Sequence, residues 1–344
     1  MPASKGRPPL VKKATLVGCS MEDSVALDNI ESMRDLINAN LESIIIEQRA
    51  IYGEVAELSG RILLAGGKRL RPILVILAYE LAGGQDIDEV MPLALASEFI
   101  HTATLVHDDI NDESLTRRGQ DTLHAIVGQP KAIIGGDWLF VQGFGLGGRY
   151  RREVVDVMAH YSSQLASAEF SQLDHVLDLS TSPEDYLEIV RGKTAGPFAA
   201  GCKGAALVAN VGEEDCNALF DFGIELGIAF QLVDDLLDIR GDERMGKPRG
   251  SDIYEGKMTL PLIHALTLLH GEQRIRLAEI IRNFDDSLFE ELISLLESAE
   301  SLKYSEILIN NHLERALNHL ESFKDCDAKQ LLKHVVNVVQ NRHS

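Results

Sequence analysis

The residues of this chain best suited to chemistry are two clusters of aspartates with the same internal spacing. Both follow the pattern D-D-x-x-D, and their members are Asp108, Asp109, Asp112, Asp234, Asp235 and Asp238. On a helix, residues four apart share a face at about 5–6 Å between Cβ atoms, so the first and last aspartates of the pattern project together. Like charges at that spacing destabilise a helix unless a cation lies between them.

The two clusters together indicate a metal site. Each follows an apolar run, EFIHTATL in the first case and FGIELGIAFQL in the second, so the carboxylates stand where a buried helix opens onto something else. Facing each other across a cavity, they would form an oxygen-rich site suited to Mg²⁺, which prefers carboxylates, water and substrate phosphates. Such a site normally serves a diphosphate. The sequence therefore predicts Mg²⁺ as the cofactor and a diphosphate as the ligand.

Basic residues elsewhere in the chain could bind the oxygens of that diphosphate. They lie in segments marked by glycine or proline, where helices end and active-site loops form. Arginine offers a planar fork to phosphate oxygens, whereas lysine offers a point charge. The candidates are the segment GGKRLRP at residues 66–72, Arg117, Arg118, Lys193, Lys247 and Lys257.

The elements that must position these residues are helices. From Ser24 onward, apolar residues recur at three- and four-residue steps, whereas strand-like alternation is almost absent. No linker divides the chain, so the pattern predicts one all-α domain over residues 22–344. Residues 1–21 carry basic residues and prolines without one acid, which predicts a mobile tail.

Composition excludes several classes of function. With 53 acidic and 33 basic residues the net charge is −20, and such a field repels the phosphate backbone of a nucleic acid. The four cysteines lie far apart with no C-x-x-C pair, which favours a reducing, cytoplasmic location over a disulfide framework or a zinc site. No run approaches the roughly 18 uncharged apolar residues of a membrane helix, so we expect no stable membrane insertion.

Two local features conflict with a simple helical pattern. Residues 143–148 match G-x-G-x-x-G, but no alternation of strands and helices surrounds them, so a dinucleotide site is not expected. Each glycine costs a helix about 1 kcal/mol relative to alanine, which puts the continuity of the helix there in doubt. Pro197, in the segment KTAGPF, is expected to kink another helix.

In their order along the chain, these motifs resemble those of the trans-isoprenyl diphosphate synthases, or polyprenyl synthetases. The likeness runs from about Leu41 to the last helices and rests on GGKRLRP, EFIHTATLVHDD with RRG downstream, KTA, and FQLVDDLLD followed by GKPRGSD and EGKMTLPL. The resemblance implies a helical bundle around a deep cavity, the isoprenoid synthase type I fold. It also implies a homodimer that joins isopentenyl diphosphate to an allylic diphosphate.

The resemblance also implies a role for each motif residue. Asp108 and Asp112 would hold Mg²⁺ on the allylic diphosphate, and Asp234 would complete the metal site from the opposite helix, with Asp238 more peripheral. The remaining motif aspartates, Asp109 and Asp235, belong to the same candidate metal set. The residues implied on the allylic side are Arg117, Lys193, Thr194, Gln231, Lys247 and Lys257. The residues implied for isopentenyl diphosphate, where no metal is expected, are Lys68, Arg71, His101 and Arg118.

The implied chemistry follows from charge. Magnesium and the basic side chains neutralise the leaving diphosphate, the allylic C–O bond ionises, and the double bond of isopentenyl diphosphate attacks the resulting cation. The released diphosphate takes the final proton, so no covalent nucleophile is needed. Thr194 and Gln231 match positions that place dipoles near the developing cation.

The small residues before the first cluster bear on product length. Ala103 and Thr104 lie about one turn, roughly 5.4 Å, deeper than Asp108. Short-chain members of the family place aromatic side chains there, whereas HTATL resembles the long-chain octaprenyl-type synthases. We therefore expect an octaprenyl-like product, with Trp138 or Phe140 as a floor farther down. Geranylgeranyl or farnesyl diphosphate is the alternative.

Other classes of protein share parts of this pattern. A terpene cyclase or a head-to-head condensing enzyme also carries acidic magnesium motifs, but it has no need of GGKRLRP, His101 and the paired arginines, which imply a second diphosphate pocket. A non-catalytic partner subunit would have lost its aspartates, whereas both clusters are intact here.

Overall fold

The computed structural model describes residues 21–117, 119–241 and 249–341. The predicted tail therefore lies almost wholly outside the described residues, as do Arg118 and Lys247. The helices of the first half are α1 (Met21–Tyr52), α2 (Glu54–Leu64), α3 (Leu70–Leu81), α4 (Ile87–Asn111), α5 (Leu123–Val127), α6 (Gln129–Gly147) and α7 (Arg152–Asp174).

The second half of the described chain is also helical. Its elements are α8 (Pro183–Val190), the π-helical turn η1 (Arg191–Ala195), α9 (Gly196–Val208), α10 (Glu213–Arg240), α11 (Ser251–Tyr254), α12 (Leu260–Leu268), α13 (Gly271–Arg282), the 3-10 turn η2 (Asp286–Leu288), α14 (Phe289–Ser298), α15 (Ser301–Leu320) and α16 (Asp327–Gln340). A two-stranded antiparallel hairpin, β1 (Thr116–Arg117) and β2 (Gln120–Asp121), follows α4. The all-α prediction is confirmed.

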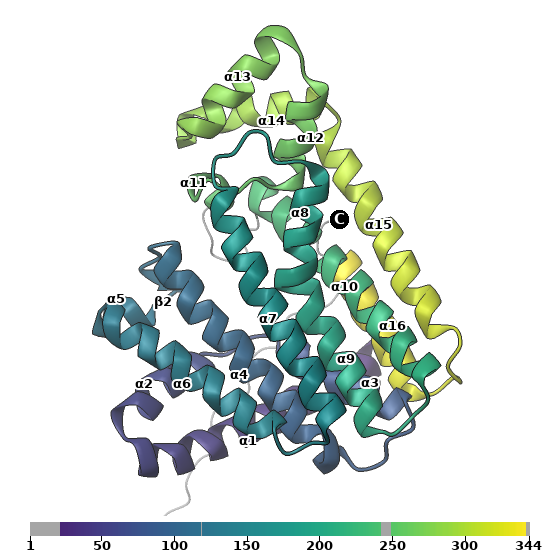
Figure 1. The fold of residues 1–344 in the computed structure, drawn as a ribbon. Helices are drawn as coiled ribbons and strands as arrows, with labels where there is room; N and C mark the ends of the chain where they lie inside the picture. Colours follow the sequence, from purple (N-terminus) through teal and green to yellow (C-terminus); the bar gives the residue numbers. More distant parts are fainter. Residues whose placement is uncertain (1–20, 118, 242–248, 342–344) are drawn as a thin grey trace, which may run out of the picture.

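The two helices that carry the aspartate clusters lie in the middle of the bundle. Helix α10 packs against α9, η1 and α15, and α4 packs against α3, α6 and α9 (Figure 1). Both helices are apolar around most of their circumference, as expected of helices surrounded by others. Phe99 on α4 and Phe222 on α10 are fully buried, so the core fixes the rotation of each helix and thereby the direction of its aspartates.

Local sequence sets the ends of α4. Its first turn is capped by Asp86, whose carboxylate accepts the N–H of Asp88 at 3.0 Å. Its last turn closes when the N–H of Asp112 donates to the carbonyl of Asp108 at 2.8 Å. Glu113 then adopts a left-handed conformation with φ 51°, which turns the chain away. The first cluster therefore occupies the final turn of a buried helix, with Asp112 at its C-cap.

The glycine-rich segment of α6 is a continuous helix, so the doubt raised by its composition was wrong. Two of its glycines, Gly143 and Gly147, lie where α6 packs closely against neighbouring helices. A Cβ on Gly143 would lie 2.8 Å from Ile100, and one on Gly147 would lie 2.3 Å from the sulfur of Met158. Glycine therefore lets α6 approach α4 and α7 more closely than alanine would.

The kink expected at Pro197 takes the form of a π-helical turn. Proline has no N–H to donate, and just before it the N–H of Gly196 reaches back five residues to the carbonyl of Arg191. Single π-turns of this kind often occur at functional sites because they displace side chains from the regular helical spacing. Here the turn carries Lys193 and Thr194.

One helix of the described part, α10, has the length and apolar composition of a membrane span. The expectation that no run approaches that composition was therefore too strict. In the bundle, 61% of the apolar window is buried against other helices, as is usual for a core helix.

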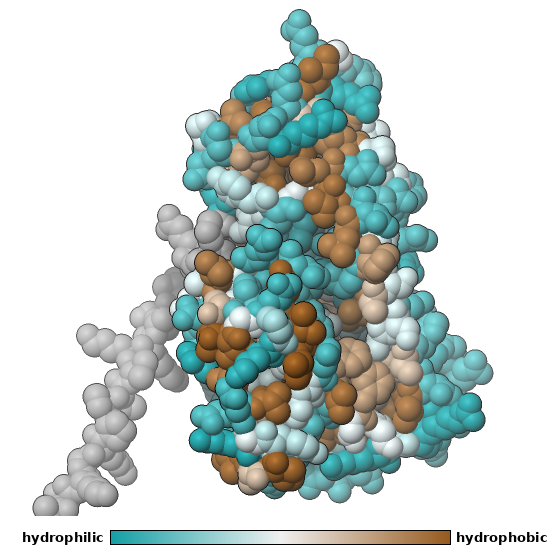
Figure 2. Space-filling model, turned by 60° about the vertical axis from the view of Figure 1, so that its left-hand side comes forward, coloured by the Kyte–Doolittle hydropathy of each residue, from teal (hydrophilic) through white to brown (hydrophobic). Residues whose placement is uncertain are grey.

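Several large apolar side chains lie on the surface of α6 and α7. On α6, Ile134 is 60% and Val141 64% exposed, and on α7, Phe170 is 74% and Leu173 53% exposed. In Figure 2, which brings the side of α2, α5 and α6 forward, apolar side chains (brown) form separate groups among polar ones. Groups of exposed apolar residues on one face are typical of protein contact surfaces.

Candidate active site

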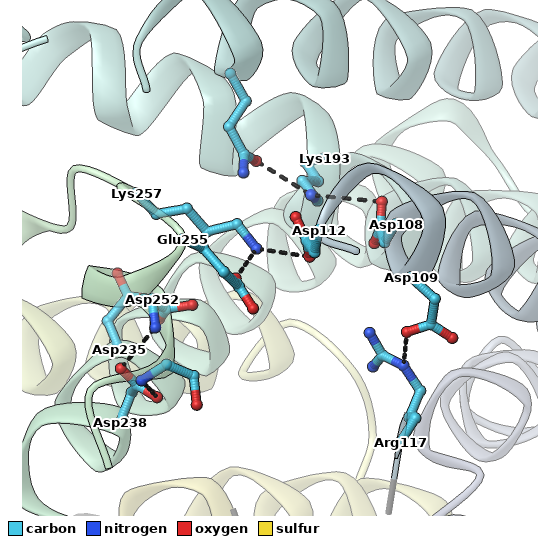
Figure 3. Close-up of polar contacts among 12 residues, drawn as sticks. Asp108, Asp109, Asp112, Arg117, Lys193, Asp235, Asp238, Asp252, Glu255 and Lys257 are labelled. Atoms are coloured by element: carbon cyan, nitrogen blue, oxygen red, sulfur yellow. Dashed lines mark hydrogen bonds and ion pairs between the residues drawn. The ribbon is translucent and has the colours of Figure 1, made fainter. Parts of the chain in front are cut away.

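The site lies where the C-terminal turn of α4 meets the π-turn η1 and the loop after α11. Asp108 and Asp112, one turn apart on α4, point toward Lys193 and Lys257 (Figure 3). The side chains of these two aspartates are 16% and 19% exposed, so both are accessible but largely desolvated. Two lysines from segments distant in sequence, Lys193 and Lys257, thus place positive charge beside these aspartates.

Lys193 lies between α4 and α7. Its ammonium group is 3.7 Å from Asp108 and 2.5 Å from Glu169, and it donates to Gln172 at 3.1 Å. Burial, together with the neighbouring Asp108 charge, raises the pKa of Glu169 to about 7, although Lys193 opposes that shift. The π-turn and α7 therefore hold this ammonium group over the first motif aspartate.

Asp108, Asp112, Lys193 and Lys257 surround the entrance to the site, called the mouth below. Lys257 has the same arrangement as Lys193 on the other side of it. Its ammonium group lies 3.0 Å from Asp112 and 2.5 Å from Glu255. Burial lowers the pKa of Lys257, but the surrounding carboxylates, Asp112 first among them, outweigh burial and hold that pKa above its usual value. Lys257 is therefore a permanent cation at the site.

The middle aspartate of the first cluster faces away from the mouth (Figure 3). Asp109 is 2% exposed and accepts a hydrogen bond from Nε of Arg117 at 2.6 Å. Burial raises the pKa of Asp109, and Arg117 opposes that shift. The pair ties the β-hairpin to α4, which gives Asp109 and Arg117 a positioning role in this structure. Their metal and diphosphate contacts stay predictions.

The middle aspartate of the second cluster is also turned inward. Asp235 is 2% exposed, accepts from the hydroxyl of Tyr186 on α8, and accepts from the amide of Gln231 at 2.9 Å. Burial and the Asp252 charge raise the pKa of Asp235 to about 8. Gln231 in turn accepts the hydroxyl of Thr194 at 2.9 Å. Asp235 therefore fixes the orientation of Gln231 and, through it, of Thr194. Its place in the metal set stays a prediction.

The last aspartate of the second cluster shapes a loop. The carboxylate oxygens of Asp238 accept the N–H groups of Ser251 and Asp252 at 3.1 and 3.0 Å, which caps the first turn of α11. Asp234, half-buried on the same helix, remains the second cluster's candidate metal ligand. Of the six motif aspartates, three thus have positioning contacts in this structure.

The donor set of the site fits the predicted metal. Among the residues that the structure describes, no group of three or more His, Cys, Asp or Glu side chains is gathered closely enough to hold a metal ion alone. Mg²⁺ seldom requires such a cage, because it keeps several waters and binds through one or two carboxylates together with substrate phosphates. Asp108 and Asp112 offer two accessible carboxylates of this kind, and Asp234 a third from α10.

A cavity of about 60 Å³ extends from this mouth into the bundle between α4, α7 and α9. On α4 it is lined at three- and four-residue steps by Leu93, Ser97, Ile100, His101 and Thr104. Thr104 lines the cavity as predicted. Ala103 is 0% exposed, lies in the core and does not line it, because it is on another face of α4. The suggested floor residues Trp138 and Phe140 also lie outside this lining.

Two of the residues predicted for isopentenyl diphosphate reach the same cavity, Arg71 from α3 and His101 from α4. Arg71 and His101 both line it, and the Arg71 guanidinium lies 4.8 Å from the ring centroid of Phe198. Lys68 is exposed in the loop before α3. The arginine between them, Arg69, is buried instead.

Arg69 anchors this loop to three helices. It donates to Asn38 on α1 at 2.9 Å, to the carbonyl of Leu63 on α2 at 2.8 Å, and to Glu98 on α4 at 2.6 Å. Its left-handed backbone, φ 51°, lets the chain turn into α3. The contacts hold the segment that carries Lys68 and Arg71 in place.

Sequence reasoning missed Glu169, Gln172, Glu255 and Tyr186. Glu255 stands two residues before Lys257 in the segment EGKMTLPL, so proximity to a predicted cation could have identified it. The contact between Gln172 and Lys193 spans 21 residues and depends on how α7 packs against η1. No local pattern signals a contact of that kind.

Carboxylates and ammonium groups thus surround the entrance to a mainly apolar cavity, and the comparisons agree with the family that the motifs resemble. Residues 53–296 match the sequence profile of the Polyprenyl synthetase family. The chain belongs to this family. It is a prenyltransferase, and its substrates are isoprenoid diphosphates.

Curated relatives of this synthase differ in the length of their products. It is 34% identical to the short chain isoprenyl diphosphate synthase of Methanothermobacter thermautotrophicus, over 83% of this chain and 89% of the relative. It is 32% identical to the octaprenyl diphosphate synthase of Haemophilus influenzae, over 90% of this chain and 95% of the relative. Similarity therefore gives the reaction class and leaves product length open.

The fold of the synthase matches solved structures. A polyprenyl synthase from Caulobacter crescentus, complexed with calcium and isoprenyl diphosphate, superposes with a TM-score of 0.85 at 33% identity, over 92% of this chain and 98% of that one. The isoprenoid synthase type I fold expected from the motifs is confirmed.

Proposed function

We propose that the synthase catalyses the Mg²⁺-dependent, head-to-tail condensation of isopentenyl diphosphate with an allylic diphosphate to give a long all-trans polyprenyl diphosphate. The observation that carries this proposal is the mouth formed by Asp108, Asp112, Lys193 and Lys257 above a cavity between α4, α7 and α9. Charged groups at the mouth suit the diphosphate, and the mainly apolar lining of the cavity suits a hydrocarbon tail, for which the cavity would have to widen.

The side chains at the mouth have separable roles in this reaction. Asp108 and Asp112, with Asp234, would hold the metal, which neutralises the oxygens of the leaving diphosphate when bound. Lys193 and Lys257 add fixed positive charge where negative charge develops as the allylic C–O bond breaks. The hydroxyl of Thr194 donates to Gln231, so its oxygen lone pairs remain for the developing allylic cation. Water exclusion by the half-buried walls strengthens each of these interactions.

We further propose a product beyond geranylgeranyl diphosphate. From Thr104 to Leu93 the lining of α4 descends three turns, about 16 Å, and on α7 it ends at Met158, eleven residues before Glu169. Thr104 is too small to close this path one turn below the aspartates. The deepest residues on the two helices, Leu93 and Met158, are the proposed floor, in place of Trp138 and Phe140. Geranylgeranyl diphosphate is the main alternative.

A homodimer is proposed as the working assembly. Ile134 and Val141 lie seven residues apart and so share one face of α6, while Phe170 and Leu173 share one face of α7. A second copy of the chain would cover such apolar faces. Sedimentation of the purified protein measures this directly, and a monomer at micromolar concentration would contradict it.

The reaction class is tested by omitting one substrate at a time. Purified protein is incubated with Mg²⁺ and farnesyl diphosphate, with and without isopentenyl diphosphate. Product that forms only when both diphosphates and Mg²⁺ are present supports condensation. A hydrocarbon formed from the allylic diphosphate alone would show a terpene cyclase, and inactivity of the purified chain would favour the non-catalytic partner subunit.

A further inference from the structure

Each lysine at the mouth is shared between two carboxylates. One is a motif aspartate, and the other is a glutamate outside both aspartate clusters. Lys193 lies 2.5 Å from Glu169 and 3.7 Å from Asp108, and Lys257 lies 2.5 Å from Glu255 and 3.0 Å from Asp112. In both pairs the glutamate is the nearer partner, although the two lysines come from unrelated segments.

The two glutamates are held by separate elements. Glu169 is on α7, where Gln172, three residues later, also accepts from Lys193 at 3.1 Å, so one face of α7 grips the ammonium group. Glu255 follows α11, whose first turn is fixed by Asp238. Their side chains are 21% and 23% exposed, so both contacts are shielded from water. The arrangement is therefore built into two elements and does not arise from mobile surface charges.

The lysine ammonium groups and a metal ion would compete for the same carboxylate oxygens of Asp108 and Asp112. An ammonium group that settled fully on Asp108 or Asp112 would occupy the carboxylate oxygens that the metal needs, and it would also repel a divalent cation. A second carboxylate beside each lysine offers the ammonium group another partner. The metal can then reach the aspartate without leaving a lysine unpaired in a largely desolvated mouth.

We propose that Glu169 and Glu255 are positioning residues that hold the ammonium groups of Lys193 and Lys257 off the metal-binding aspartates. This inference rests on the proposed function, because it takes Asp108 and Asp112 as the metal ligands. It assigns the two glutamates an effect on metal affinity that is transmitted through the lysines and requires no direct contact with the metal.

The test measures Mg²⁺ affinity in the glutamate variants. Glu169→Gln and Glu255→Gln should each raise the Mg²⁺ dissociation constant of the substrate-free protein, measured by calorimetry, by about fivefold. The Mg²⁺ concentration for half-maximal turnover should rise in parallel, and excess Mg²⁺ should restore turnover. Glu314→Gln, an exposed change on α15 with the same change in formal charge, is the matched control and should alter neither constant.

A double-mutant cycle separates this route from direct metal binding by the glutamate. In a Lys193→Met background no ammonium group remains to be held, so Glu169→Gln should change the dissociation constant by less than about twofold. An equal effect of Glu169→Gln in both backgrounds overturns the proposal, as do unmoved constants in an active enzyme. A wild-type protein that does not condense the two diphosphates refutes the proposed function instead.

Discussion

The ammonium group of Lys257 lies 3.0 Å from the carboxylate of Asp112, although 145 residues of chain separate them. The contact joins the end of α4 to the loop after α11, so the two sides of the mouth are held at a distance set by one ion pair. Lys193 makes the corresponding link from η1 to Asp108. Both pairs place positive charge at the mouth, where we propose that the diphosphate leaves.

Removing the charge of one candidate metal ligand should abolish turnover without unfolding the protein. Asp108→Asn and Asp112→Asn keep the size of each side chain but remove a carboxylate from accessible positions, so we expect turnover to fall by about 10³-fold or more. Circular dichroism and the unfolding temperature should stay close to those of the wild type. Near-normal turnover in both variants would falsify the metal assignment.

The middle aspartate of the first cluster should respond differently from these ligands. Asp109 is buried, so Asp109→Asn removes the charged partner of Arg117, whose side chain is 28% exposed. We expect a lower unfolding temperature together with reduced activity, since a charge-assisted hydrogen bond contributes roughly 1.5–3 kcal/mol. A thermal melt of Asp109→Asn beside Asp108→Asn makes the comparison, and equal unfolding temperatures would contradict it.

Substrate affinities should separate by pocket. Arg71→Ala and His101→Ala remove groups that line the cavity beside α3, so the KM for isopentenyl diphosphate should rise about tenfold or more, equivalent to a charge-assisted contact of roughly 1.5–3 kcal/mol. The KM for the allylic diphosphate should change little. Steady-state kinetics with each substrate varied in turn decides the matter, and the reverse pattern would mean that the pockets are exchanged.

Bulk introduced at Thr104 should shorten the product. Thr104→Phe places a ring in the cavity one turn below Asp108, so elongation should stop several isoprene units earlier while condensation continues. Ala103→Phe is the informative contrast, because Ala103 is fully buried in the core and overpacking there costs about 1–3 kcal/mol. Product chromatography and thermal melts of both variants test this. An unchanged product from Thr104→Phe would place the path elsewhere.

Glu80 should make stability depend on pH far from the active site. Burial first, and then the Asp327 charge, raises the pKa of Glu80 above its unfolded value. A raised carboxyl pKa means that the folded state holds the proton more tightly, so this contribution to stability is complete below the unfolded pKa and is lost as pH rises through the folded one. Above that window the ionised carboxylate destabilises the fold.

Replacing this carboxylate should therefore help at neutral pH only. Glu80→Gln should raise the unfolding temperature by about 1–3 °C at pH 7.5, and the gain should shrink as the pH is lowered toward about 4.5. Melts of both proteins across this range provide the measurement. A gain that is constant with pH would show that the Glu80 charge is not its cause.

Features that depend on residue spacing along the chain could be predicted from the sequence. Apolar periodicity predicted the helical bundle, and the four-residue step placed Asp108 and Asp112 on one face. It could not say that Asp109 meets Arg117 or that Asp235 meets Tyr186, because those contacts depend on how α4 and α10 are rotated against their neighbours. The same limit applied to Ala103, one residue from Thr104 but on another face of the helix.

The glycines of α6 show a second limit. Read locally, they weaken a helix by about 1 kcal/mol each. In the bundle, Gly143 and Gly147 let α6 approach Ile100 and Met158 more closely than alanine would without a shift of those side chains, so packing offsets propensity there. Pro197 was the opposite case, since its missing N–H was a local property and the disturbance it predicted is present in η1.

Mass spectrometry of the product made by the purified chain, with Mg²⁺, farnesyl diphosphate and excess isopentenyl diphosphate, tests the central claim most directly. We expect linear prenyl diphosphates longer than geranylgeranyl diphosphate, with octaprenyl diphosphate the main species, and no product when Mg²⁺ is chelated. A product that ends at geranylgeranyl diphosphate would contradict the proposed chain length, and the absence of any condensation product would contradict the account of the site itself.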